Sequence, residues 1–324
     1  MSSIAFLGTG LLGSAFVEAA LGRGDTVTVW NRTRSKAAAL VPFGAIVADT
    51  PADAVRGAKR IHLVLSDDAV VDAVIKDITP ALGADAIIID HTTTQPALTA
   101  ERASRLAAAG IRYLHCPVFI GPAAARQALG TILVAGPRSL YESVQPALAA
   151  QAAKVEYVGE RADLAAVYKL AGNAFIIGIV GLVADTLTMA KAVDVEPKAI
   201  LEVLRMFNPA AIITGRGKAI AERNYAPSFE LVMARKDVRL MLETAGEETL
   251  CMLPGLAERI DALLAEGHAA DDLAVLGRDA VKGERGAASP RWVNGVRGGT
   301  CKGKGERGGR PGWVCGKVCE ETPP

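Results

Sequence analysis

The sequence predicts an α/β fold, in which a doubly wound parallel sheet is followed by an all-helical region. Over about the first 160 residues, short apolar runs with many β-branched residues alternate with Ala-rich runs of helical length. Strands that are apolar on both faces and separated by helices are typical of a parallel sheet covered on both sides. From Asp163 onward the strand-like runs stop and only helical patterns remain.

The strand candidates are short runs in which apolar residues predominate. They are residues 4–7, 26–30, 45–48, 61–65, 86–90, 111–117, 131–135 and 155–158. Helices are expected between them, for example at 11–23 and 96–109 and near 139–149. A helix between successive strands gives the chain the length that it needs to cross the sheet and pair in parallel.

The second half predicts helices only. Residues 163–192 form one helical run that is apolar nearly all round, and shorter helices are expected near 197–205, 217–223, 229–243 and 253–266. A helix this apolar needs cover on most sides, so we expect a partner element or a second copy of the chain, and hence at least a homodimer. Its uncharged stretch, 170–184, is shorter than the roughly 20 residues that cross a bilayer, which favours a buried helix.

Composition excludes several classes of partner. Half of the 324 residues are apolar and the formal net charge is +1, so neither nucleic acid nor an anionic membrane is expected as a partner. The chain begins with a strand pattern and shows no signal peptide. Cys116 and Cys251 are isolated, as in reduced cytosolic proteins, which predicts a cytoplasmic location. Cys301, Cys315 and Cys319 lack the second close pair or the histidines of a zinc site, so no metal is expected.

A glycine fingerprint, G-x-G-x-x-G, lies between the first strand and the first helix. It consists of Gly8, Thr9, Gly10, Leu11, Leu12 and Gly13. Gly8 permits a tight turn, Gly10 lets a pyrophosphate approach the backbone, and Gly13 allows close helix–strand packing. The free N–H groups of the following helix attract phosphate. This context predicts a dinucleotide-binding Rossmann domain.

The residues after the second strand indicate which dinucleotide is bound. Asn31, Arg32 and Thr33 stand there, with Lys36 nearby, in place of the Asp or Glu that bonds the ribose 2′-hydroxyl of NAD. Arg32 can hold a 2′-phosphate through two hydrogen bonds, and Thr33 can donate its hydroxyl. The pattern therefore predicts NADP as the cofactor, although these cations could also form a solvated helix start.

Three segments are expected from these patterns. Residues 1–162 form the NADP-binding Rossmann domain, and residues 163–283 form a helical domain for substrate binding and dimerisation. Residues 284–324, rich in Gly and Arg, are predicted to be disordered. Leu65 and Ser66 end the fourth strand at the carboxyl edge of the sheet, where such sheets bind ligands, and so join the predicted cofactor residues.

Five elements in order resemble the β-hydroxyacid dehydrogenases, especially the branch similar to 3-hydroxyisobutyrate dehydrogenase, over residues 1 to about 282. After the glycine fingerprint, residues 90–96 resemble the D-x-S-T-x-x-P segment of that family, and residues 116–118 followed by 130–131 resemble its substrate stretch. Residues 169–173 match its K-x-x-x-N, and Phe229 with 236–237 matches its F…K-D element. The resemblance implies a Rossmann domain, similar to that of 6-phosphogluconate dehydrogenase, joined by a long helix to a helical domain, often in intertwined dimers.

The resemblance also implies roles for individual residues. Lys169 is the expected general acid/base, and Asn173 holds substrate or orients the lysine. Their i, i+4 spacing places both on one helix face. Thr93 is expected beside the nicotinamide and the substrate, and Lys236 is expected to approach the cofactor from the second domain. Without the resemblance, Lys169 could be read as an exposed lysine whose ammonium reaches water from an apolar helix.

The substrate stretch departs from the family pattern. The family usually reads P-V-S-G-G, where the serine and backbone amides receive a carboxylate, whereas this chain has Phe119, Ile120 and Gly121 after Pro117-Val118. Phe119 replaces the serine, and the distance to Gly130 is two residues longer. These three residues are the predicted substrate contacts, together with Thr93 and Asn173. A larger or less anionic carbonyl compound is compatible with the change.

The sequence therefore predicts an NADP-dependent oxidoreductase that transfers a hydride between the nicotinamide and a 3-hydroxy acid, a semialdehyde or a related small carbonyl compound. Lys169 would move the accompanying proton. Two alternatives stay open. Imine reductases share the architecture and the W-N-R-T segment, but they generally lack a lysine at position 169. A nucleotide-binding protein without turnover is the other alternative, because the substrate stretch departs from the pattern.

Overall fold

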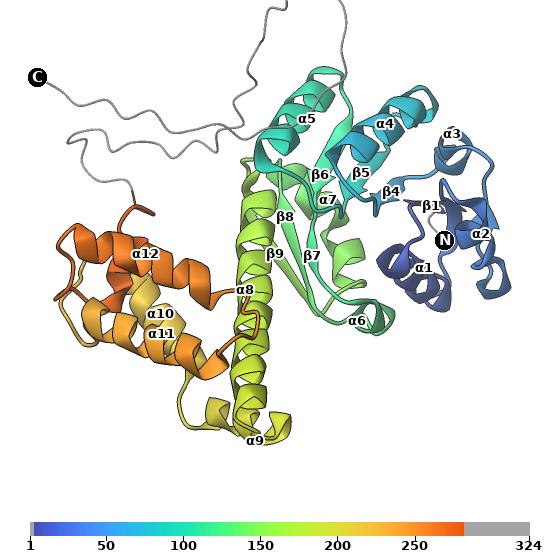
Figure 1. Ribbon diagram of the computed structural model, residues 1–324. Helices are drawn as coiled ribbons and strands as arrows, with labels where there is room; N and C mark the ends of the chain where they lie inside the picture. Colours follow the sequence, from blue (N-terminus) through green and yellow to red (C-terminus); the bar gives the residue numbers. More distant parts are fainter. Residues whose placement is uncertain (1–2, 282–324) are drawn as a thin grey trace, which may run out of the picture.

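In the computed structural model, which describes residues 3–281, nine strands form a single sheet with helices on both faces (Figure 1). The strands are β1 (Ser3–Leu7), β2 (Thr26–Trp30), β3 (Ile46–Val47), β4 (Arg60–Leu63), β5 (Ile87–Asp90), β6 (Arg112–His115), β7 (Val118–Phe119), β8 (Thr131–Ala135) and β9 (Lys154–Gly159). Their order is β3-β2-β1-β4-β5-β6-β8-β7, and β9 pairs with β8. The predicted α/β fold class is confirmed.

The first six strands pair in parallel, and β8 runs antiparallel to β6 and β7. The strand order reverses at β1, which lies between β2 and β4. Parallel sheets of this kind bind ligands at the carboxyl ends of the strands beside such a reversal. The topology therefore directs attention to the loops that follow β1 and β4.

Two apolar cores, one on each face, hold the sheet. Phe6 faces one core with Phe16, while Leu7 faces the other with Ile75, so successive residues of β1 are buried on opposite sides. The helices that cover the sheet are α1 (Leu11–Gly22), α2 (Arg34–Ala38), α3 (Pro51–Val55), α4 (Asp68–Ile78), α5 (Pro96–Ala108), α6 (Pro122–Arg126) and α7 (Arg138–Ala149), with short 3₁₀ turns η1 (Val41–Phe43) and η2 (Thr79–Ala81).

After the sheet the described chain is helical. The elements are α8 (Leu164–Ala192), α9 (Pro197–Leu201), η3 (Glu202–Arg205), α10 (Pro209–Ala221), α11 (Leu231–Ala245), α12 (Leu253–Ala265) and η4 (Leu273–Gly277). Helices α11 and α12 share a small core with η4, to which Leu231, Ile260 and Val275 contribute. Figure 1 shows α8 standing between the sheet and the bundle of α10, α11 and α12.

The apolar helix α8 is not covered as the sequence suggested. Only four of its side chains are buried within the chain, namely Ala165, Ala166, Asp185 and Ala190, whereas Ile177 is 70% exposed. The prediction that residues 170–184 are buried is therefore wrong for the single chain, because the bundle contacts one side of the helix and leaves the others open. By length and composition, α8 is the one helix among residues 3–281 that could cross a membrane.

Other predicted elements differ in extent. The helix expected at 217–223 is α10, which begins at Pro209, where the side chain of Asn208 caps the helix by accepting a hydrogen bond from the Ala211 N–H. Strand β7 has two residues and was not expected as a separate strand. The boundaries proposed between domains stay a prediction, and the segment 284–324 with its three cysteines lies outside the described residues.

Candidate active site

The glycine loop after β1 has two glycines that the protein itself requires. Gly8 has a φ of +99°, and an added Cβ would stand 2.2 Å from the Val64 carbonyl oxygen. A Cβ on Gly13 would stand 2.1 Å from the Gly8 carbonyl oxygen. Both distances are far below contact, so a side chain at either position would force β1, α1 and β4 apart.

Gly10 differs from the other two glycines. Its φ of −70° suits any residue, and a Cβ there would meet no atom of the described residues within 4 Å. The fold therefore does not explain this glycine. Among residues 3–281 no side chain caps the start of α1, which leaves its first N–H groups available to an acceptor. Space above the backbone and free N–H groups are what a pyrophosphate needs, so the loop fits a dinucleotide.

A cavity of about 290 Å³ lies along this loop at the carboxyl edge of the sheet. Its lining includes most of the residues that the sequence assigned to the cofactor in this region. They are Gly10, Leu11, Leu12, Gly13, Leu65, Ser66 and Thr93, together with Val64, His91 and Thr92. The loops after β1, β4 and β5 thus meet as expected from their places in the sheet.

The loop that carries Thr93 is held by a buried carboxylate. Asp90, fully buried at the end of β5, accepts hydrogen bonds from the Thr92 N–H and the Tyr113 hydroxyl, both at 2.9 Å. The Thr92 hydroxyl in turn accepts a hydrogen bond from the Leu65 N–H at 3.1 Å. This network fixes the loops after β4 and β5 relative to each other. Sequence reasoning missed Tyr113, whose only signal was a polar hydroxyl on an otherwise buried strand.

The residues after β2 surround a second cavity, of about 220 Å³. Asn31 Oδ1 accepts a hydrogen bond from the Thr9 N–H, and its amide donates to the Thr33 carbonyl, both at 3.0 Å, so Asn31 ties this segment to the glycine loop. Arg32 lines the cavity and is exposed, and Lys36 is exposed on α2. The arrangement offers cations beside the glycine loop, which suits a 2′-phosphate.

Lys169, on α8, contacts two of the predicted residues. Its ammonium donates a hydrogen bond of 2.9 Å to Asn173 Oδ1, one helical turn on. The same Nζ stands 4.3 Å from the centroid of the Phe119 ring, which comes from β7. Burial lowers the pKa of Lys169 from its ordinary value near 10.5. A half-buried lysine with a lowered pKa and an orienting amide can exchange a proton with a substrate.

The remaining predicted substrate residues follow Phe119. Ile120 packs against the core on the α1 side of the sheet, and Gly121 is the exposed residue that precedes α6. Strand β7 pairs with the start of β8, so this segment lies beyond the carboxyl end of β6. It therefore stands at the same edge of the sheet as the glycine loop.

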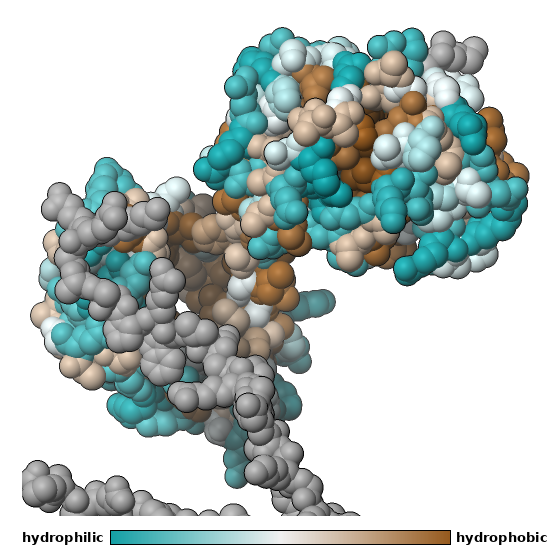
Figure 2. Space-filling view, turned by 90° about the horizontal axis from the view of Figure 1, so that it is seen from above, coloured by the Kyte–Doolittle hydropathy of each residue, from teal (hydrophilic) through white to brown (hydrophobic). Residues whose placement is uncertain are grey.

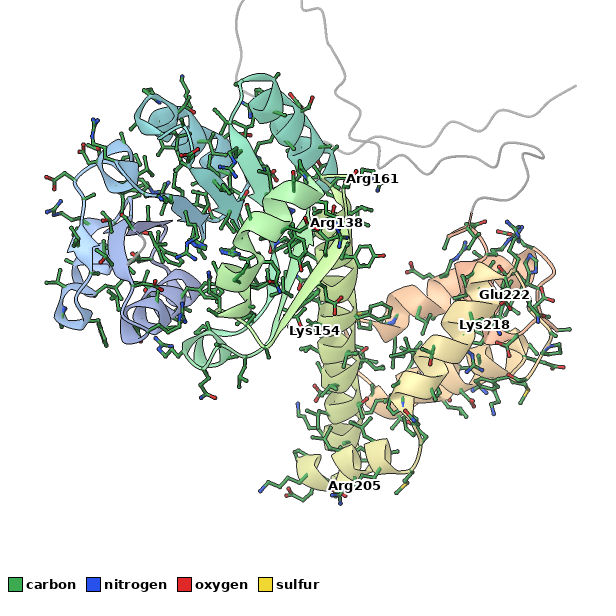
Figure 3. All side chains as sticks on the ribbon, turned by 180° about the vertical axis from the view of Figure 1, so that it is seen from behind. Arg138, Lys154, Arg161, Arg205, Lys218 and Glu222 are labelled. Carbon is green, nitrogen blue, oxygen red and sulfur yellow. The ribbon has the colours of Figure 1, made fainter. Side chains whose placement is uncertain are left out.

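Lys236 is the predicted cofactor residue that the single chain does not bring to this edge. It lies on α11, and its ammonium pairs with Asp237 at 2.8 Å. Figures 1 and 3 show α11 in the bundle on the far side of α8 from the glycine loop. Its predicted role toward the cofactor of the same chain has no support from this arrangement and stays a prediction.

Three buried histidines lie behind the cofactor loops. His91 Nδ1 donates to the Cys116 carbonyl at 2.7 Å, so the neutral His91 ring accepts at Nε2 from His62 Nδ1 at 2.9 Å. Burial lowers the pKa of His91 to about 4 and holds that of His62 well below its ordinary range. His115 is also buried and donates to the Thr92 carbonyl at 3.0 Å. The hydrogen bonds of these rings support the loops, and His91 also borders the cavity along the glycine loop.

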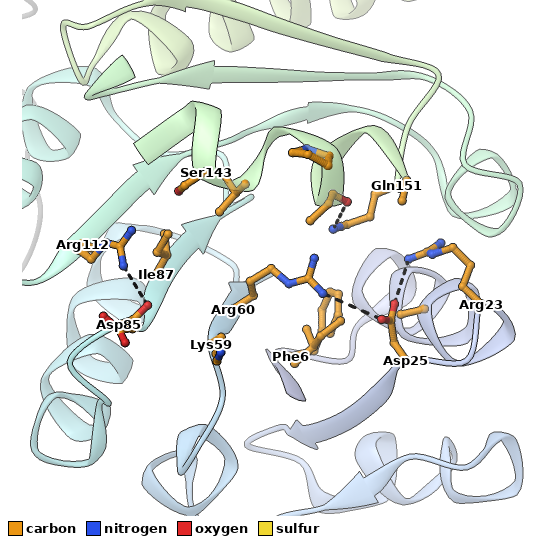
Figure 4. A pocket seen from close by; sticks show the side chains of 16 residues that line it. Phe6, Arg23, Asp25, Lys59, Arg60, Asp85, Ile87, Arg112, Ser143 and Gln151 are labelled. Carbon is orange, nitrogen blue, oxygen red and sulfur yellow. Dashed lines mark hydrogen bonds and ion pairs between the residues drawn. The ribbon is translucent and has the colours of Figure 1, made fainter. Parts of the chain in front are cut away.

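A larger cavity, of about 640 Å³, lies elsewhere (Figure 4). It opens at the amino ends of the parallel strands and is lined by polar side chains such as Arg23, Asp25, Lys59 and Arg60. No residue of the glycine loop reaches it. Because ligands of such sheets bind at the opposite edge, the smaller cavity along the glycine loop is the better candidate for the active site.

Two family models match nearly all of the described chain. The NAD binding domain of 6-phosphogluconate dehydrogenase matches residues 3–159, and the NAD-binding domain of NADP-dependent 3-hydroxyisobutyrate dehydrogenase matches residues 164–277. These matches confirm the predicted nicotinamide dinucleotide cofactor.

Named relatives and a solved structure are similar to this chain. Glyoxylate/succinic semialdehyde reductase 1 of Arabidopsis thaliana is 28% identical over 77% of this chain and 87% of its own length. Cytokine-like nuclear factor N-PAC of Homo sapiens is 30% identical over 74% of this chain and 44% of its own length. The imine reductase from Myxococcus stipitatus in complex with NADP+ has the same fold, with a TM-score of 0.78, 23% identity, and coverage of 85% of this chain and 99% of that chain.

Proposed function

The chain belongs to the β-hydroxyacid dehydrogenase-like family, and on this premise we propose that it is an NADP-dependent dehydrogenase or reductase acting on a CH–OH/carbonyl pair, with Lys169 as its general acid/base. The proposed substrate is a small 3-hydroxy acid, a semialdehyde or a related carbonyl compound. The observation that carries the proposal is the contact between the half-buried Lys169 ammonium and Asn173 at 2.9 Å. Titratable groups with a specific partner and a shifted pKa are candidates for catalysis.

The cofactor is assigned to the carboxyl edge of the sheet. Gly10 and the start of α1 would take the pyrophosphate, and Arg32, Thr33 and Lys36 would take the 2′-phosphate. When bound, a reduced nicotinamide supplies the hydride that a carbonyl carbon accepts. Leu65, Ser66 and Thr93 would border the nicotinamide end, and Thr93 would also meet the substrate.

Lys169 handles the proton. In the reductive direction its ammonium donates a hydrogen bond to the carbonyl oxygen and releases its proton to that oxygen, which gains the electron pair of the C=O π bond. In the oxidative direction the neutral amine removes the hydroxyl proton. The lowered pKa favours this second role, and Asn173 keeps the Nζ in place by accepting one of its three N–H bonds.

We assign the exposed surface of α8 to a second copy of the chain. Large apolar side chains on this helix, such as Phe175, Ile176, Ile177 and Val180, are half or more exposed. Figure 2 shows apolar surface gathered between the two lobes of the molecule. Contiguous exposed apolar side chains of this kind usually mark a surface that another molecule covers. A homodimer supplies it without a membrane, and it fits the proposed cytoplasmic, small-molecule enzyme.

Consumption of NADPH with a panel of semialdehydes, aldehydes and ketones tests the proposed function. In Lys169→Ala and Lys169→Arg, kcat should fall by about 10²- to 10⁴-fold, the range typical of a lost general acid, while NADPH still binds. Lys154→Ala, which removes an exposed lysine on β9, should behave as wild type. Equal turnover in wild type and both Lys169 variants would refute the role of Lys169.

The fold is shared with an imine reductase, so a second candidate function is reduction of C=N bonds by NADPH. A cyclic imine assayed beside a semialdehyde separates the two: turnover of the imine alone, and independent of Lys169, would favour this alternative. The departure of the substrate stretch at Phe119 leaves a third possibility, nucleotide binding without turnover. NADPH binding without turnover of any carbonyl or imine would favour it.

A further inference from the structure

The Phe119 ring lies beside the proposed proton donor. Its centroid lies 4.3 Å from Lys169 Nζ, within the distance at which the negative face of an aromatic ring attracts a cation. Lys169 therefore has two described partners, the amide oxygen of Asn173 and the face of this ring. One partner is polar and the other is apolar and electron-rich.

The fold is built around this ring. A Cβ on Gly172 of α8 would stand 2.3 Å from Phe119 Cζ, so the ring rests directly on the helix backbone and would have to move if this glycine carried a side chain. On the other side of the segment, a Cβ on Gly130 would stand 2.7 Å from the Phe119 carbonyl oxygen and 2.8 Å from Ile120 Cγ1. Gly130 has a φ of +89°. Gly172 and Gly130 thus allow the close contacts that the segment with Phe119 makes on both sides. These contacts fix the position of the ring.

A substrate of Lys169 lies close to this ring. A carbonyl oxygen that receives the proton stands about 3 Å from Nζ, and the ring is centred 4.3 Å from the same atom. The oxygen therefore lies within about 7 Å of the ring centre, and an apolar chain on the carbonyl carbon can reach the ring face. The ring face repels a carboxylate and offers it no hydrogen-bond donor. A carboxylate there would instead pair with the Lys169 ammonium and occupy the proton donor.

We propose that Phe119 determines the substrate class of this site: it selects uncharged carbonyl compounds with an apolar chain over compounds that carry a carboxylate near the carbonyl. The inference rests on the proposed function and narrows the substrate of that same site from the classes named there to the related, uncharged carbonyl compounds. Phe119 also positions Lys169 by holding its ammonium over the ring.

Most charged side chains on the elements that pack against α8 have partners of their own, whereas no ion pair is recorded among the described residues for Glu101 on α5 or Lys198 on α9. The pairs are Lys154 with Glu156 on β9, Arg161 with Asp163 before α8, Arg102 with Asp68 and Asp72 beside α5, Arg235 with Asp261, Lys236 with Asp237 and Arg239 with Glu243 on α11, and Lys191 with Glu248. Burial is accordingly the cause of the lowered pKa of Lys169. A change of the ring should therefore be visible in the titration of this lysine.

Two aldehydes of matched shape test the selectivity, namely succinic semialdehyde and 4-methylpentanal, in which an isopropyl group replaces the carboxylate. Wild type should turn over 4-methylpentanal with a kcat/KM at least about tenfold higher, since tenfold corresponds to about 1.4 kcal/mol. In Phe119→Ser this ratio should fall at least about tenfold, whereas Phe119→Tyr, which keeps the ring, should retain it. Phe43→Ser, which removes an exposed ring on η1, should leave the ratio unchanged.

The outcomes distinguish the role of Phe119 from the proposed function. Lys169-dependent turnover with a preference for succinic semialdehyde, or with an unchanged ratio in Phe119→Ser, overturns the role of Phe119 and leaves the proposed function intact. If neither aldehyde nor any other carbonyl compound is reduced in a Lys169-dependent way, both claims fall. Circular dichroism and NADPH binding show whether each variant is folded.

Titration of Lys169 by NMR separates positioning from mere packing. Phe119→Leu keeps an apolar side chain but removes the ring face that stabilises the ammonium. The pKa of Lys169 should therefore fall by a further 0.5 to 1.5 units or so, the range that cation–π attraction implies. An unchanged pKa in Phe119→Leu would overturn the positioning role, and this readout does not depend on turnover.

Discussion

Arg32 stands exposed after the end of β2, beside the cavity that Asn31 also borders. Its guanidinium is available to a 2′-phosphate, whereas that of the neighbouring Arg34 is paired with Asp49. Arg32→Ala should therefore weaken NADPH binding by about 10- to 100-fold, the value of a charge-assisted hydrogen bond, and leave NADH binding nearly unchanged. Fluorescence titration with both cofactors measures this.

Arg34→Ala is the matched control for Arg32, because its charge is already satisfied by Asp49. It should change the ratio of the two affinities much less. An NADPH-to-NADH affinity ratio that is the same in Arg32→Ala and wild type would remove Arg32 from the cofactor site.

The buried pair His62 and His91 makes stability depend on pH. Burial holds the pKa of His91 at about 4, while the unfolded chain takes up a proton from about pH 6.5 downward. The unfolded state thus binds more protons in this window, and the free energy of unfolding should fall as the pH drops from 7 to 5. His91 alone accounts for about 2 kcal/mol of this fall.

Urea unfolding at pH 7, 6 and 5 measures the effect. His268→Gln, which alters a partly exposed histidine in the helical bundle, should show the same slope as wild type. An unfolding free energy that stays constant between pH 7 and pH 5 would mean that the two rings are charged or solvated in the folded protein.

At the scale of elements, the glycines between β1 and α1 have two different roles. Gly8 and Gly13 are needed for packing, whereas Gly10 is expected to make room for the ligand. Gly10→Ala should keep the melting temperature near that of wild type, because its Cβ meets nothing in the described chain, and should weaken NADPH binding at least about tenfold. Gly13→Ala should instead destabilise the protein, since its Cβ would overlap the Gly8 carbonyl. Thermal unfolding and NADPH titration of both variants distinguish the two roles, and a destabilised Gly10→Ala with normal affinity would contradict them.

Asp185 joins α8 to the start of α12. Its carboxylate accepts hydrogen bonds from the N–H groups of Cys251, Met252 and Leu253 at 2.7 to 2.9 Å. Burial by itself would raise the pKa of Asp185, but these donors outweigh it and lower the pKa. Asp185→Asn leaves an NH₂ group facing N–H donors, so we expect a loss of about 2 to 3 kcal/mol of unfolding free energy.

Glu222→Gln is the matched control for that change. Glu222 follows the last residue of α10 and is exposed beside Lys218 (Figure 3), with 3.8 Å between Lys218 Nζ and Glu222 Oε1. The substitution should therefore cost less than about 0.5 kcal/mol. Urea unfolding compares the two variants. Equal stability of Asp185→Asn and wild type would show that the α8–α12 junction does not depend on this carboxylate.

For the whole molecule, the exposed surface of α8 predicts a dimer. Light scattering after size exclusion should give about twice the chain mass of 33.7 kDa. Ile177→Glu places a charge on the most exposed apolar side chain of α8 and should shift the protein toward monomer, because burying a charge without a partner is unfavourable. Val41→Glu, exposed on η1, should leave the mass unchanged. A monomeric wild type at micromolar concentration would contradict the proposed dimer.

Three features follow from local sequence patterns: the parallel sheet, the cofactor loop and the contact between Lys169 and Asn173. The alternation of apolar runs and helical runs specified the parallel sheet, because strand and helix periods differ and each segment must bury its apolar face. The fingerprint around Gly10 specified the cofactor loop, since its spacing reflects one strand–turn–helix unit. The contact between Lys169 and Asn173 followed from helical geometry alone, because residues four apart share a face.

Contacts between segments that are distant in the sequence could be found in the tertiary structure but not predicted from local patterns. Phe119 contacts Gly172, more than 50 positions later in the sequence. The hydrogen bond from Tyr113 to Asp90 links β6 to the neighbouring strand β5. The tertiary structure also decided that α11 carries Lys236 away from the glycine loop and that α8 stays open on most sides. Local patterns encode which face of an element is apolar, but not which surface covers it. That choice depends on packing among all elements, and for α8 on a surface that the single chain does not supply.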